Sequence, residues 1–171
     1  MAAPDPEHLF EQAEALAAPP PAGPPKQVSL RRAISSAYYG VFHFIVAAAA
    51  DQLAGVTRRS TSEYGRVYRS IEHKNVRELC ENINKQNLPA RYLPHVPANG
   101  LGTDIIAFSA AFVELQEKRH AADYDPMIRV KLSDARLAIR TARAAVGRFN
   151  AASNARRKAF LSLLLFPPRR G

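Results

Sequence analysis

Hydrophobic residues recur at three- and four-residue steps along most of the chain, which is the spacing of one face of an α-helix. The clearest case is the segment Val28 to Leu53, with apolar positions at Ile34, Tyr38, Val41, Ile45 and Ala48. Ser29 is a candidate cap at its start and Gly55 a candidate stop. Few stretches alternate with a period of two. The pattern therefore predicts an all-α protein.

The same spacing predicts further helices after the first long one. They cover Ser62 to about Asn84 as a single helix, Thr103 to the interruption at Tyr124–Pro126, Ser133 to Phe149, and a short helix that starts at Asn154. Residues 85–102 are rich in proline, asparagine and glycine, which is typical of a loop. The expected architecture is an up-and-down bundle of four to five helices with short connections.

Proline and acidic residues set the first 27 residues apart. Seven of the 13 prolines fall in the first 25 residues, and this part of the chain is acidic. Asp5 to Leu16 is predicted to form a short helix, with Asp5 as cap and Pro6 at its first position. We therefore divide the chain into an acidic, proline-rich extension (1–27), a helical domain (28–166) and a basic tail (167–171).

Charge separates the two ends of the chain. The protein has 171 residues and a formal net charge of +9. From Pro126 onward there are 11 lysines and arginines against one acidic residue, Asp134. Such a block attracts phosphates or an acidic partner. The alternative is that arginines simply cover solvated helix faces.

Several classes of protein are disfavoured by composition. Cys80 is the single cysteine, so an internal disulfide framework is excluded. No apolar run approaches the roughly 18 residues of a membrane span, and no basic leader precedes an apolar segment. The histidines show no metal-binding spacing. We expect a cytoplasmic protein with no membrane association, no metal and no cofactor.

Two places along the chain carry candidate chemistry. His43 lies between two phenylalanines on the first long helix, where a hydrogen-bonded core or groove histidine is favoured over a catalytic one. Arg119 and Asp123 are four residues apart and share a helix face. They are either an ion pair near a helix stop, or a phosphate-binding arginine beside His120 or Tyr124, which could transfer a proton.

Two segments resemble the HEPN superfamily. The run LRRAISSAYYGVFH, residues 30–43, resembles a helix of these proteins that carries a Tyr-Tyr pair. The run RHAADY, residues 119–124, resembles the RxxADY signature of a HEPN subgroup. His73 and Lys74 fall where that subgroup often has a His-Lys pair. The resemblance covers about residues 28–150.

The resemblance implies a compact, often dimeric helical bundle. Many such proteins are metal-independent endoribonucleases of toxin–antitoxin or defence systems, and some are paired with a nucleotidyltransferase antitoxin. Others bind nucleotides or are not catalytic. In the nuclease members an arginine is followed, after four to six residues, by a histidine. The arginine would hold the scissile phosphate while the histidine moves a proton.

This chain departs from that pattern, because Tyr124 stands where the histidine is expected. His120 is adjacent to Arg119 and points about 100° away on a helix. Arg66 and His73 fit the spacing formally, but they belong to the second predicted helix and we regard the match as coincidence.

The resemblance and the residue types together give our site prediction. Arg119, His43, His120 and Tyr124 are the candidate catalytic residues, and Arg119, Asp123, Tyr38 and Tyr39 are the candidate substrate-binding residues. His43 would line the same groove as Arg119 if the first and third predicted helices pack together.

We therefore expect a HEPN-like protein that binds RNA or nucleotide phosphates, with metal-independent endoribonuclease activity as its candidate reaction. The alternative is a catalytically inactive interaction module. Such a module would form a homodimer or bind a nucleotidyltransferase antitoxin that modifies Tyr124. The two hypotheses differ in the environment of Arg119: exposed in a basic groove, or buried against Asp123.

Overall fold

The computed structural model describes residues 4–169, and every regular element in this range is helical. The α-helices are α1 (Pro6–Leu16), α2 (Gln27–Ala54), α3 (Ser62–Ser70), α4 (His73–Ile83), α5 (Gly102–Tyr124), α6 (Leu132–Ala151) and α7 (Asn154–Leu165). Two 3-10 helices, η1 (Val56–Arg58) and η2 (Ala90–His95), lie in the connections. The all-α prediction is confirmed, whereas a specifically HEPN-like arrangement stays a prediction.

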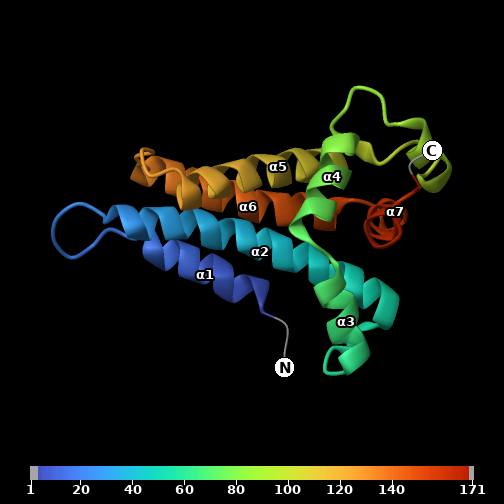
Figure 1. Cartoon of the computed structure of the whole chain (residues 1–171), viewed down its shortest axis with the longest axis horizontal. Helices are drawn as coiled ribbons and strands as arrows, with labels where there is room; N and C mark the ends of the chain where they lie inside the picture. Colours follow the sequence, from blue (N-terminus) through green and yellow to red (C-terminus); the bar gives the residue numbers. More distant parts are fainter. Residues whose placement is uncertain (1–3, 170–171) are drawn as a thin grey trace.

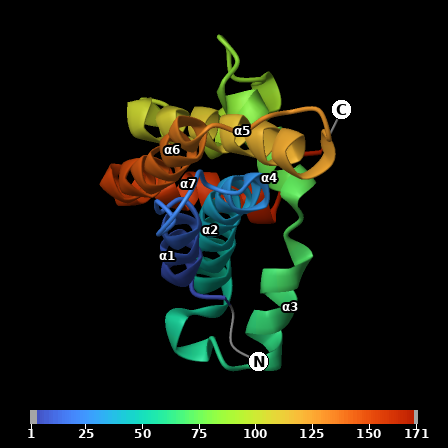
Figure 2. The same cartoon turned by 90° about the vertical axis from the view of Figure 1, so that its left-hand side faces the viewer.

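The long helices define the shape of the molecule (Figure 1). α1, α2, α5 and α6 run along its longest axis, while α4 crosses them and α7 is seen nearly end-on. α3 extends away from the other helices next to the end of α2 (Figure 2). Helix α2 packs against α1, α5 and α6, and α4 packs against α5. This places one face of α2 toward the start of α4 and the end of α5.

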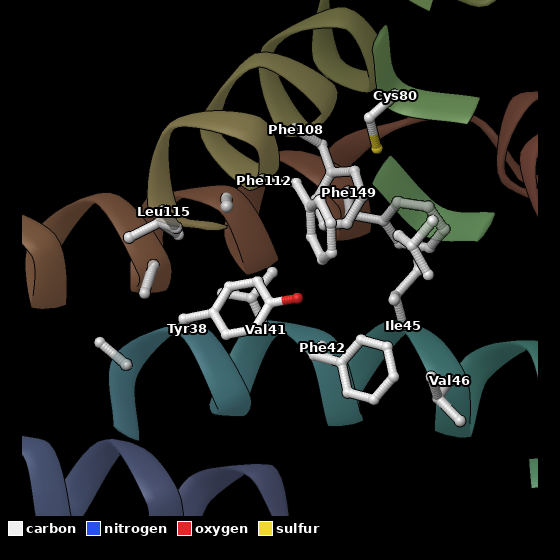
Figure 3. Packing of buried hydrophobic residues seen from close by; sticks show 14 of the residues in the cluster. Tyr38, Val41, Phe42, Ile45, Val46, Cys80, Phe108, Phe112, Leu115 and Phe149 are labelled. Carbon is white, nitrogen blue, oxygen red and sulfur yellow. The ribbon is translucent and has the colours of Figure 1, made fainter. Parts of the chain in front are cut away.

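The core between α2, α5, α6 and α7 is mainly aliphatic and phenylalanine side chains (Figure 3). Phe108 and Phe112 of α5 are fully buried, and the Phe108 ring contacts the rings of Phe149 and Phe160 with centroids 5.1 and 5.5 Å away. Burying rings of this size is the main source of stability in a domain of this length. We call these four residues the phenylalanine core.

Helix α2 is the most apolar of the long helices. Its length and composition fit a membrane span, with a mean hydropathy of 1.4 over its most apolar window. It is the exception to the expectation that no apolar segment reaches that length. However, 67% of this window is buried inside the protein, as in the core helix of a folded domain.

The predicted N-terminal helix is present and belongs to the packed structure. α1 begins after Asp5, whose side chain accepts a hydrogen bond from the Glu7 backbone N–H at 2.9 Å. Its apolar face includes Phe10, which is buried against α2. Phe10 lies so close to Gly40 that a Cβ at position 40 would be 2.4 Å from the ring. Gly40 therefore permits the close approach of α1 to α2.

The prediction of one helix over residues 62–84 is wrong, because the chain turns at Ile71 and Glu72. Both residues adopt extended backbone angles, and they separate α3 from α4. The Ser70 hydroxyl donates to the Val67 carbonyl at 2.7 Å, in place of a continued helix. The turn buries Ile71, so tertiary packing overrides the helical spacing.

Some predicted helix ends also differ from the structure. α2 begins at Gln27 with Lys26 as its cap residue, so Ser29 is not the cap, while Gly55 does follow its end as predicted. At the start of α2, the Gln27 side chain forms two hydrogen bonds with the backbone of Val130. α5 begins at Gly102, one residue before the predicted start at Thr103.

Candidate functional site

The residues that carry the resemblance come from α2, α4 and α5, and several of them meet beside Tyr38 and Tyr39 of α2, together with Tyr68 of α3. Five side chains form what we call the tyrosine–histidine cluster: Tyr38, Tyr39, His43, Tyr68 and His73. Arg119 of α5 contacts this cluster through Tyr39. Since α2 packs against both α3 and α5, the cluster is assembled by tertiary contacts.

Tyr38 and His73 form the buried half of the cluster. The Tyr38 hydroxyl and Nδ1 of His73 share a hydrogen bond of 2.7 Å. The His73 imidazole also stacks on the Phe42 ring, with centroids 3.7 Å apart. Tyr38 is fully buried, and this burial raises the pKa of its phenol. Tyr38 therefore acts as a neutral hydroxyl that orients the His73 ring.

His43 and Tyr68 form the second hydrogen-bonded pair. Nδ1 of His43 lies 2.6 Å from the Tyr68 hydroxyl, and the two rings stack with centroids 5.9 Å apart. Burial raises the pKa of Tyr68 to about 12, so this hydroxyl stays protonated near neutral pH. The expectation of a hydrogen-bonded histidine at position 43 is confirmed.

Both imidazoles are held in their neutral forms. Burial lowers the pKa of His43. Burial also lowers the pKa of His73, and the nearby charge of Arg119 and proximity to His43 act in the same direction. The Tyr39 ring contacts both imidazoles, with centroids 6.2 Å from His43 and 5.7 Å from His73. Two neutral imidazoles thus flank one tyrosine.

Arg119 lies at the edge of the cluster and is mostly covered. Its guanidinium donates to the Tyr39 hydroxyl at 2.9 Å, and Nε lies 2.8 Å from Oδ2 of Asp123. Its side chain is 18% exposed. Nε is buried and its contact with Asp123 is not aligned as a hydrogen bond. The guanidinium also lies 5.4 to 5.8 Å from the ring centres of Tyr38, Tyr39 and Tyr124.

The helix end that carries Asp123 is fixed to α2 by two polar side chains. The Ser35 hydroxyl donates to Oδ1 of Asp123. The Arg31 guanidinium donates to backbone carbonyls at the end of α5 and in the following turn, namely those of Ala122, Asp125, Pro126 and Ile128. The Ala122 carbonyl lies in the last turn of α5, where carbonyls lack helical partners, and the other three follow the helix, so Arg31 acts as a long-range cap of α5.

The remaining predicted site residues lie on the exposed side of α5. Tyr124 is 64% exposed, and its ring centroid lies 5.0 Å from that of His120. His120 is exposed, and among the described residues its only ring contact is with Tyr124. The structure therefore brings Tyr38, Tyr39, His43, Arg119 and Asp123 together, and it leaves His120 outside the cluster.

Two members of the cluster are not predicted by the sequence pattern. The pattern puts His73 on a charged face of one long helix, but the turn at Ile71 makes it the first residue of α4 and points it at α2. The match of the His73–Lys74 pair to the HEPN subgroup is the one signal that points to His73. No signal in the sequence marks Tyr68.

Comparisons with known proteins do not extend the resemblance. A scan against protein-family models matches no family, and searches of curated proteins and of solved structures find no significant similarity. In the described part of the chain, no group of three or more histidine, cysteine and acidic side chains is placed to hold a metal ion.

Proposed function

We propose that the tyrosine–histidine cluster and Arg119 bind an RNA phosphate and cleave the RNA backbone by proton transfer between imidazoles. The observation that supports this proposal is the position of Tyr39. Its ring contacts His43 and His73, and its hydroxyl accepts a hydrogen bond from Arg119. One tyrosine thus brings together a cation and two imidazoles, the groups that such a reaction uses.

The reaction would divide between the two histidines. One neutral imidazole accepts the proton of the ribose 2′-hydroxyl while O2′ attacks phosphorus. The other takes up a proton from solvent and donates it to the 5′-oxygen as the P–O5′ bond breaks. The products are a 2′,3′-cyclic phosphate and a 5′-hydroxyl. The Nδ1 atoms are bonded to Tyr38 and Tyr68, which leaves the Nε2 atoms for substrate. Arg119 would stabilise the charge that develops on the phosphate.

A second candidate function is supported by the burial of Arg119. Its ion pair with Asp123 and its small exposed fraction fit a structural arginine, as in a catalytically inactive interaction module. In that case the exposed Tyr124 would belong to the surface offered to a second copy or to a nucleotidyltransferase. The two candidates predict different results for the same variants, so one experiment separates them.

The test is an RNA cleavage assay in the presence of EDTA. Wild type is compared with Arg119→Ala, His43→Gln and His73→Gln, and circular dichroism checks that each variant folds. The matched control is His120→Gln, because this imidazole is exposed outside the cluster. We expect His43→Gln and His73→Gln each to reduce cleavage by about 10²–10⁴-fold. No cleavage by wild type would favour the interaction module. Equal cleavage by all variants would show that neither the cluster nor Arg119 catalyses the reaction.

A further inference from the structure

Three arginines of α6 lie along one side of the helix. Arg136, Arg140 and Arg143 occupy positions i, i+4 and i+7, which fall within an arc of about 60° and extend about 10 Å along the axis. We call them the α6 arginine stripe. Arg136 and Arg140 are exposed, and neither has an ion-pair or hydrogen-bond partner among residues 4–169. The tyrosine–histidine cluster contains no residue of α6, so the stripe is a separate surface.

Arg143 differs from the other two arginines because it forms ion pairs with acidic side chains of α1. Its Nη atoms lie 2.8 and 3.3 Å from the Glu7 carboxylate oxygens, and Nε lies 2.6 Å from Glu14. The guanidinium also lies 5.1 Å from the centre of the Phe10 ring. α1 contacts both α2 and α6, and Figure 2 shows it beside α2 below α6. The acidic helix thus neutralises one end of the stripe.

We propose that the α6 arginine stripe binds the phosphate backbone of RNA, and that Glu7 and Glu14 of α1 compete with RNA for Arg143. Arginine suits this task because its planar fork of donors matches phosphate oxygens. The proposal rests on the proposed function only for the identity of the ligand. The stripe would be a second RNA-binding surface besides the cluster, and α1 would weaken RNA binding at this surface.

The geometry of the Arg143 contacts explains why this competition is reversible. Glu7 and Glu14 place three carboxylate oxygens around the guanidinium, as a bound phosphate would place its own oxygens. All three side chains are 38 to 54% exposed, so water and salt weaken each ion pair. RNA needs to displace only these two carboxylates. Phe10 and Ala13 keep α1 in the core throughout.

The test measures binding of a fluorescently labelled 2′-O-methyl oligouridylate of about 20 nucleotides, which has no 2′-hydroxyl and cannot be cleaved. Anisotropy is recorded from about 50 to 300 mM KCl. We expect Glu7→Gln/Glu14→Gln to bind about three- to tenfold tighter at low salt, with a salt slope steeper by about 0.7. We expect Arg136→Gln/Arg140→Gln to weaken binding about tenfold and to reduce the slope by about 1.4.

Matched variants separate release of Arg143 from a change in net charge. Glu11→Gln removes one charge from α1 at a position that has no partner in the described chain, and it is compared with Glu7→Gln alone. In the wild-type background Arg143→Gln should leave affinity nearly unchanged. In the Glu7→Gln/Glu14→Gln background it should abolish the gain. A gain that persists without Arg143 would overturn the proposal.

The result is also distinguishable from failure of the proposed function. Arg119→Ala should abolish cleavage of ordinary RNA while it keeps the effects of the stripe variants on the uncleavable oligonucleotide. If Arg136→Gln/Arg140→Gln binds as wild type does, or if wild type shows no binding at the lowest salt, the stripe is not an RNA surface. Cleavage would then still test the tyrosine–histidine cluster on its own.

Discussion

Two aromatic regions of this molecule are held together by different forces. In the phenylalanine core, rings from α5, α6 and α7 contact one another without any polar atom. In the tyrosine–histidine cluster, two hydrogen bonds set which ring faces which. The first region stabilises the fold through the hydrophobic effect, which depends on the apolar area buried and not on the direction of individual contacts. The second region depends on the orientation of a few hydrogen-bond donors and acceptors, so the loss of a single hydroxyl or ring nitrogen should change its geometry.

The largest effect on stability should come from the phenylalanine core. Phe108→Ala removes a fully buried ring and leaves a cavity, so we expect a loss of about 3–5 kcal/mol in the free energy of unfolding. Urea denaturation followed by circular dichroism measures it. Tyr39→Phe in the cluster removes a hydrogen bond from a charged donor and keeps the ring, so it should cost less, about 1.5–3 kcal/mol. Similar losses of stability in Phe108→Ala and Tyr39→Phe would contradict the view that the two regions contribute to stability in different ways.

A smaller but directional effect is expected for Tyr38→Phe. The substitution keeps the buried ring and removes only the hydroxyl, which leaves Nδ1 of His73 without its partner. We expect a loss of about 1–2 kcal/mol in urea denaturation. A double-mutant cycle with His73→Gln isolates the hydrogen bond. Strictly additive losses would show that the hydroxyl and the imidazole are not coupled.

Acid should lower the free energy of unfolding through the two histidines of the cluster, because the phenylalanine core contains no titratable group. Burial keeps the pKa values of His43 and His73 below their ordinary value of 6.5 in the folded protein. As pH falls below about 7, the unfolded chain therefore binds protons first, and the free energy of unfolding decreases. Urea midpoints between about pH 5 and 8 should fall more steeply for wild type than for His43→Gln/His73→Gln. Parallel profiles would contradict this.

The smallest effect is expected for Ser35→Ala. Its hydroxyl donates to Asp123, whose other oxygen pairs with Arg119. The ion pair remains in the variant, and the Asp123 carboxylate is partly open to water, so we expect a cost below about 1 kcal/mol. A change in the cleavage rate larger than the change in stability would show that Ser35 positions Arg119 through Asp123.

The sequence predicted the helices better than the site. Apolar periodicity located α2, α5, α6 and α7, because each buries one or more apolar faces. It failed at Ile71, where burial of one side chain stabilises an extended turn that local spacing does not reveal. His73 follows that turn directly, so the same error hid its place in the cluster.

The pairing of side chains was predictable only within one helix. The Arg119–Asp123 ion pair follows from their spacing, and it is present at 2.8 Å. Contacts between helices, such as His43 with Tyr68, depend on how α2 and α3 pack. The departure of Tyr124 from the nuclease pattern was visible in the sequence. That His73 enters the cluster from another helix was not.

The four carbonyls bound by Arg31 have a consequence for the order of folding. Arg31 is separated from these carbonyls by 91 to 97 residues, so the last turn of α5 is completed by a segment from the first quarter of the chain. Contacts over such distances in sequence form late, because a long loop must close first. The corner that carries Asp123 and Tyr124 is therefore expected to acquire slow amide hydrogen exchange only when α2 has docked. During synthesis, it would stay unfinished until both segments have emerged.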